Sequence, residues 1–191
     1  MLTTMLRSIK ELYGYEVRST DALIGKVREF YLDDEKWVVR SIGIIGGILL
    51  PAELLEETDP QQRAFFLQLN AAAIREKLEN RSENSQLRAA RRLFGLLMFA
   101  RNGVIGKVED LVVNDADLSV RYFVVDAPVH GQKFVISPWW IQEIDWEYGE
   151  IRLRFGLERV LRSPKFDFQM PVSREYEAAL HEYYDKQTYF A

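Results

Sequence analysis

The chain repeats itself once along nearly its whole length, and this duplication limits the folds that it can adopt. The tetrapeptide IGKV occurs at residues 24–27 and again at residues 105–108, an offset of 81 residues. A repeat this long is typical of a duplicated domain and not of a solenoid of short units. We therefore predict two similar domains, the first over residues 1–80 with a trailing helix and the second over residues 81–191 with a C-terminal helical tail.

Each copy has the pattern of a small curled β-sheet. Apolar residues stand at Val27, Phe30 and Leu32, so their spacing is three and then two, whereas a regular strand would alternate. The second copy has the same slip, which indicates a β-bulge in both. The segments DDEK (33–36) and NDAD (114–117) predict hairpin turns. The expected fold class is mainly β with flanking helices, as two small tandem β-barrels that are each followed by a helix.

Helices are expected at a few places between and after the strands. Ser8 can cap a short helix that ends near Gly14, and the second copy instead predicts a longer helical run over residues 82–95. Asn70 can cap a helix over residues 70–80. The C-terminal segment predicts another helix, capped by Ser173, with an apolar stripe that consists of Tyr176, Leu180 and Tyr184.

Composition excludes some classes of function. The chain has no cysteine, so thiolate metal sites and cysteine nucleophiles are excluded, and a reducing cytoplasm is the expected location. No run of about 20 apolar residues is present, so no transmembrane helix is expected. The net charge of −4 disfavours general nucleic-acid binding, although residues 70–101 carry 7 basic and 3 acidic residues, a net of +4.

The sequence resembles a tandem of PRC-barrel domains. The resemblance is carried by the opening LRSIKELYGYEV, the Gly-containing IGKV strand, VRYFVVDA, KFVISPWWIQEIDW and the closing SPKFDFQMPVSREYEAALHEYY. The second copy matches nearly throughout. The first copy departs after Ile45, where GIIGGILLPAELLEE lacks the aspartate found at Asp126. Together the two copies cover almost the entire chain.

The resemblance implies a docking role. PRC-barrels form the cytoplasmic domain of the H subunit of the photosynthetic reaction centre and a domain of a ribosome-maturation factor. We therefore expect a non-catalytic protein–protein interaction or structural adaptor module that binds a protein partner. A homodimer is also expected, because tandem barrels with short connectors can exchange elements between chains and symmetric dimers are the commonest assemblies. The alternatives are a peripheral accessory of a membrane photosynthetic or electron-transfer complex, bound at its cytoplasmic face, and a ribosome or RNA assembly factor.

Motifs for chemistry are not found in the sequence. His130 and His181 have no partner at metal-ligand spacing and are expected at the surface, and no HExxH or phosphate-loop pattern occurs. The acidic cluster Asp33–Glu35 fits turn chemistry better than a calcium loop. We therefore predict no catalytic, cofactor-binding or metal site.

A candidate interaction surface can still be named from aromatic and basic residues. It consists of Trp139, Trp140, Arg88, Arg91 and Arg92. Adjacent residues on a strand point to opposite faces, so the tryptophan pair predicts one core residue and one half-exposed residue, or else an aromatic anchor for a partner. The arginines either form a solvated connector or offer a docking surface for an acidic partner.

Overall fold

The computed structural model describes residues 5–79, 87–167 and 172–184 of the chain. Its residues form two compact units. Unit 1 comprises residues 1–93 and 113–120, and unit 2 comprises residues 94–112 and 121–191. The segment 113–120 lies in the second copy of the sequence repeat but in unit 1 of the structure, so the repeats and the units divide the chain differently.

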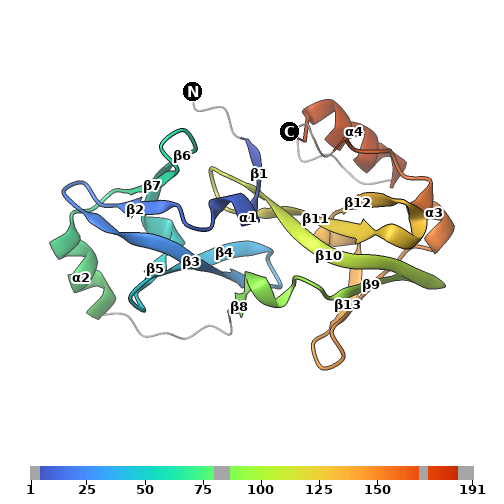
Figure 1. The fold of residues 1–191 in the computed structure, drawn as a ribbon, viewed down its shortest axis with the longest axis horizontal. Coiled ribbons are helices and arrows are strands. Elements are labelled where there is room, and N and C mark those ends of the chain that lie inside the picture. Colours follow the sequence, from blue (N-terminus) through green and yellow to red (C-terminus); the bar gives the residue numbers. More distant parts are fainter. Residues whose placement is uncertain (1–4, 80–86, 168–171, 185–191) are drawn as a thin grey trace. The chain divides into compact units, whose positions relative to one another are not determined.

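The structure is mainly β with a few short helices, as predicted (Figure 1). The elements up to Arg92 are β1 (Leu6–Ser8), α1 (Ile9–Leu12), β2 (Glu16–Arg18), β3 (Leu23–Asp33), β4 (Val38–Ile44), β5 (Leu49–Pro51), η1 (Ala52–Leu54), β6 (Leu55–Asp59), β7 (Ala64–Leu67), α2 (Ala71–Glu79), β8 (Arg88–Ala89) and η2 (Ala90–Arg92), where η denotes a 3-10 helix.

The remaining elements repeat this series with additions at the C-terminus. They are β9 (Leu97–Ala100), β10 (Gly103–Asn114), β11 (Val120–Ala127), η3 (Pro128–His130), β12 (Gln132–Ile136), η4 (Pro138–Trp140), β13 (Ile141–Asp145), β14 (Glu150–Leu153), α3 (Leu157–Leu161) and α4 (Arg174–Tyr183). The last helix, α4, has no counterpart among the described elements of the first copy.

Two seven-stranded sheets have the same strand order, as the sequence repeat requires. One runs β5-β4-β3-β2-β7-β6, with β8 also paired to β3, and the other runs β12-β11-β10-β9-β14-β13, with β1 also paired to β10. In each sheet one parallel contact, β2 with β7 or β9 with β14, joins antiparallel hairpins. Among the described strands, the hydrogen-bonded order of each sheet ends at two edge strands and does not close into a ring.

Side chains on one face of the unit 1 sheet make its core. Phe30 of β3 and Phe65 of β7 are fully buried, and their ring centroids lie 6.3 Å apart. Ile42 and Leu50 are opposite each other in the β4–β5 register and are also buried. Because residues alternate across a strand, their neighbours Gly43 and Leu49 lie on the other, outer face of the sheet. This outer face carries the candidate site.

The predicted helix caps are present. Ser8 accepts a hydrogen bond from the Glu11 amide, Asn70 accepts one from the Ala73 amide at 2.8 Å, and Ser173 accepts one from the Tyr176 amide. The long helical run predicted over residues 82–95 is wrong where it is described, from residue 87 onward. That segment is β8 followed by a single 3-10 turn, because its backbone pairs with β3. Residues 82–86 lie outside the described residues.

Candidate functional site

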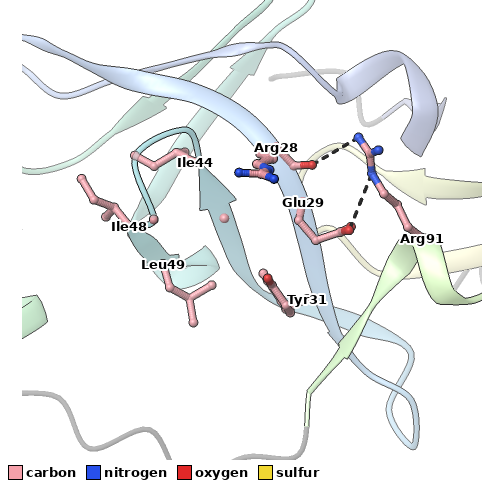
Figure 2. Close-up of a pocket in the computed structure, with 9 residues that line it drawn as sticks. Arg28, Glu29, Tyr31, Ile44, Ile48, Leu49 and Arg91 are labelled. Atoms are coloured by element: carbon pink, nitrogen blue, oxygen red, sulfur yellow. Dashed lines mark hydrogen bonds and ion pairs between the residues drawn. The ribbon is translucent and has the colours of Figure 1, made fainter.

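A hollow of about 570 Å³ lies on the outer face of β3, β4 and β5 in unit 1 (Figure 2). Its volume is within the range of ligand-binding clefts. We call it the unit 1 groove, and its lining residues are Arg28, Glu29, Tyr31, Gly43, Ile44, Gly47, Ile48, Leu49 and Arg91. Figure 2 shows the three β3 residues opposite the three apolar residues of the β4–β5 hairpin, with Arg91 beside Glu29.

The floor of the groove is backbone, because its central residue is a glycine. Gly43 pairs with Glu29 of β3 on one side and with Leu49 of β5 on the other. A Cβ atom added at Gly43 would lie 3.0 Å from Cε2 of Tyr31, so the tyrosine ring lies directly against this position. Any larger residue at Gly43 would therefore fill the hollow between Tyr31 and Leu49.

The β-bulge predicted in β3 is confirmed, and it places Arg28 at the groove. The register moves from Val27 directly to Glu29, so Arg28 is the extra residue of the bulge. Its side chain is exposed, and no ion pair with a described carboxylate is formed. The Glu29 carboxylate accepts a hydrogen bond from the Phe30 amide at 2.9 Å, which stabilises the distorted backbone.

A second arginine reaches the groove from the other copy of the repeat. Arg91 follows β8, and β8 pairs with β3 through Ala89 and Tyr31. The Arg91 guanidinium lies 3.6 Å from the Glu29 carboxylate, donates to the carbonyl oxygen of Arg28 at 3.3 Å, and lies over the ring of Tyr13 at 4.4 Å. Its side chain is still 59% exposed, so it can also contact a ligand.

The phenol of Tyr13 completes the support beneath Arg91. Its hydroxyl donates to the Glu29 carboxylate at 2.7 Å. Burial, together with the hydrogen bond and the negative charge of Glu29, raises the pKa of Tyr13, so the hydroxyl keeps its proton and remains a donor. Glu29 therefore has fixed partners, whereas the guanidinium of Arg28 faces solvent.

Apolar side chains flank these cations. Ile45, at the tip of the β4–β5 hairpin, is 63% exposed, and Ile48 is 37% exposed. The Ile45 amide donates to the carbonyl oxygen of Lys26 at 3.0 Å, which anchors the tip to β3. A groove with two arginines on one side and the apolar residues Ile48 and Leu49 on the other is suited to a ligand that is both acidic and apolar.

The corresponding face of unit 2 is filled and buried. The repeat places Val112 and Val124 at the positions of Tyr31 and Gly43, and Val135 pairs with Val124 as Leu49 pairs with Gly43. All three valines are buried. The position of Arg28 is occupied by Glu109, which forms an ion pair with Lys133 at 2.6 Å.

Helix α4 covers this face of unit 2 (Figure 1). Tyr122 of β11, on the same face as Val124, donates its hydroxyl hydrogen to Glu177 at 2.8 Å, and its oxygen lies 2.9 Å from Nε2 of His181. The ring of Tyr184 stacks against Trp140, with centroids 4.0 Å apart. In unit 1 the residue in place of Tyr122 is the much shorter Ser41.

The buried imidazole of His181 should make the stability of unit 2 depend on pH. Burial, with a smaller contribution from the Arg121 charge, lowers the pKa of His181 below its ordinary 6.5. The unfolded chain therefore binds a proton more readily, and stability falls as the pH drops from 6.5 toward the lowered pKa. Burial raises the pKa of Glu177, so protonation of this carboxyl favours the fold and opposes the loss at lower pH.

Urea unfolding at a series of pH values, with wild type and a His181→Gln variant, checks this expectation. The glutamine amide can still bond to the Tyr122 hydroxyl but does not titrate. We expect the wild type to lose more stability than the variant when the pH falls below 6.5. Parallel curves for the two proteins would contradict the expectation.

The residues of the predicted interaction surface have different environments. Trp140 has no exposed surface, so it is a core residue of unit 2 and its place in the predicted surface is corrected. Trp139 is 48% exposed. Arg88 forms an ion pair with Asp34 at 3.2 Å, Arg92 is exposed, and Arg91 lines the unit 1 groove.

Of the nine residues that line the groove, only Arg91 was among the predicted ones. Arg28, Tyr31 and Gly43 are examples of the others, and they lie in strand segments where sequence alone shows no motif. A signal was nevertheless present, because the two copies differ in charge at one bulge position, with Arg28 in the first and Glu109 in the second. Positions at which duplicated domains differ in charge are thus informative about sites.

The two histidines differ in exposure, and the acidic turn at Asp33 has the expected hydrogen bonds. The expectation that His181 lies at the surface is wrong, because it is 2% exposed beneath α4, whereas His130 is partly exposed and contacts the Val104 carbonyl oxygen at 3.1 Å. Asp33 accepts hydrogen bonds from the amides of Glu35 and Lys36, as turn chemistry predicts. Within residues 5–79, 87–167 and 172–184, no group of three or more acidic or histidine side chains could hold a metal ion.

Comparison with known proteins adds no assignment. No protein-family model matches the chain, and no significant match is found among curated proteins. Among the helices of the described residues, none is long and apolar enough to cross a membrane. The geometry of the unit 1 groove is therefore the main evidence for function.

Proposed function

We propose that the protein is a non-catalytic adaptor, built from two PRC-type β-barrel domains, that binds a protein partner in the unit 1 groove. The resemblance of the sequence to tandem PRC-barrels and the matching strand orders of the two sheets support the architecture. The observation that carries the function is the divergence of one sheet face. It is closed by a helix in unit 2, whereas the described residues of unit 1 leave a hollow on it that is lined by Arg28 and Arg91.

The groove favours a protein partner over a nucleic acid. Its charge is limited, since Glu29 lies between the two arginines, and the lining residues Ile48 and Leu49 supply apolar contact area. Nucleic-acid binding usually requires a broad set of cations that neutralise several phosphates. A site that combines a few cations with apolar residues is instead typical of protein recognition.

Affinity capture from a lysate of the source organism tests the proposal. The tagged wild type is compared with Arg28→Glu and with Lys165→Glu, a control that makes the same charge change at an exposed position of unit 2. We expect a stoichiometric partner that is retained by the wild type and by Lys165→Glu and lost with Arg28→Glu. Equal retention by all three proteins would contradict binding in the groove.

A further inference from the structure

We propose that the occupant of the unit 1 groove is an acidic amphipathic helix of the partner, which covers unit 1 as α4 covers unit 2. This inference rests on the proposed function and specifies the ligand. Its first support is the duplication itself. The same outer sheet face, with the same strand order, is covered by a helix in one unit, whereas the described residues of the other unit leave a hollow on it.

The way α4 binds shows what such a helix presents to the sheet. Glu177 and His181, one helical turn apart, both contact the Tyr122 hydroxyl, and Leu180 between them is fully buried. Its ten residues, Arg174–Tyr183, include three glutamates and one arginine, so the covering helix is itself acidic. A helix on unit 1 would use apolar side chains in the same way, above Gly43 and Leu49.

The positive charge of the unit 1 groove favours an acidic helix more strongly than the charge at the equivalent position of unit 2 would. In unit 2 the position of Arg28 holds Glu109, which Lys133 neutralises. In unit 1, Arg28 is exposed and Arg91 is held beside it by contacts with Glu29 and the Tyr13 ring. Guanidinium groups that are positioned in this way form strong hydrogen bonds to carboxylates. Acidic side chains along one edge of the helix would meet them.

The edge of the sheet is a poorer docking site than its face. β5 is an edge strand, and an extended peptide could in principle add to it. However, β5 has only three residues and ends at Pro51, which has no amide hydrogen to donate. The open face, in contrast, provides a hollow of about 570 Å³ with a glycine at its floor.

The test uses isotope-labelled full-length protein and a helix-stabilised peptide of about 18 residues, long enough to remain helical. The acidic peptide carries leucines at helical spacing and glutamates elsewhere, and the control peptide carries lysines in place of the glutamates. We expect the acidic peptide to shift the amide resonances of Tyr31, Gly43 and Leu49, and the lysine peptide to leave them unchanged. Arg28→Glu should weaken the acidic peptide at least about tenfold and favour the lysine peptide.

A second variant distinguishes binding in the groove from nonspecific electrostatic attraction, because it changes no charge. Gly43→Val places at the groove floor the residue that unit 2 has at Val124. The Cβ atom of the new side chain would lie 3.0 Å from Cε2 of Tyr31, so this ring must move to admit it. We expect this variant to fold like the wild type and to bind the acidic peptide at least about tenfold more weakly. The Lys165→Glu control should bind the peptide as the wild type does.

Several results would overturn the inference. Shifts confined to residues outside the groove, equal binding by the Gly43→Val variant, or an extended peptide bound along β5 would each do so. Inorganic phosphate that shifts the groove resonances, with no effect of the acidic peptide, would indicate a small-anion site instead. If the cellular partner depends on Arg28 but the peptide does not bind, the adaptor function stands and the helical ligand does not. If neither depends on the groove, both fail.

Discussion

Replacing Gly106 by alanine is expected to lower the free energy of unfolding by about 3 kcal/mol or more, the range of severe backbone clashes in a core. A Cβ atom at this position would lie 2.1 Å from the carbonyl oxygen of Asp126, on the neighbouring β11 strand. Because both partners are backbone, no side chain can rotate to relieve the contact. β10 and β11 would have to separate, and unit 2 would lose part of its sheet.

Gly25 is the matched control, because it occupies the same place in the other IGKV copy. A Cβ atom there would lie 3.4 Å from the Cδ1 atom of Ile44, an ordinary contact with a side chain that can adjust. The Gly25→Ala variant should therefore change the free energy of unfolding by no more than about 1 kcal/mol. Urea unfolding of both variants measures the difference. Equal stability of the two would contradict the close approach of β10 and β11.

Truncating Trp140 to alanine is expected to destabilise unit 2 by about 3 to 5 kcal/mol, the usual cost of removing a buried aromatic side chain. The indole has no exposed surface and touches Tyr184 and Phe155, with ring centroids 4.0 and 6.2 Å away. Its loss would leave a cavity beneath α4, and His181 of this helix would lose a ring contact at 5.5 Å.

The neighbouring Trp139 provides the control. Its side chain is 48% exposed, so Trp139→Ala should lower the free energy of unfolding by no more than about 1 kcal/mol. Thermal and urea unfolding, followed by circular dichroism, compare the two variants directly. A Trp140→Ala protein with wild-type stability but weaker association would show that Trp140 is a surface anchor after all.

Features that depend on local chain chemistry were predictable from the sequence. The apolar spacing of Val27, Phe30 and Leu32 indicated the bulge, and the register of β3 and β4 contains it. Gly14, predicted to end the first helix, has a φ of 78°, which glycine adopts without strain. The caps at Ser8 and Asn70 follow from the same local hydrogen bonding.

Features that depend on contacts between distant segments were not predictable. The location of Arg91 depends on the pairing of β8 with β3. Because β8 has only two residues, its sequence shows no alternation of apolar and polar residues that would predict a strand. The burial of His181 depends on which sheet face α4 covers, and an amphipathic helix can pack on several faces. The floor of the groove is Gly43, in the middle of a strand. The importance of this glycine follows from its contact with the ring of Tyr31, which the sequence does not show.

The two units differ at the same face of their sheets. In unit 2 the sheet face is covered by α4, which accepts a hydrogen bond from the Tyr122 hydroxyl at Glu177 and thereby contributes to stability. The equivalent face of unit 1 has a glycine floor and two arginines, and we propose that it binds a partner. A duplicated domain can in this way keep one copy as scaffold while the other acquires recognition.

The most direct test of this account is a side-by-side capture of the cellular partner by wild type and Gly43→Val, with the thermal midpoint of both proteins measured first. The change fills the groove with the residue that unit 2 has at the same position and leaves the surface charge intact. We predict that the two proteins melt alike and that only the wild type retains the partner. Retention of the same partner in the same amount by Gly43→Val would contradict the assignment of the groove as the binding site.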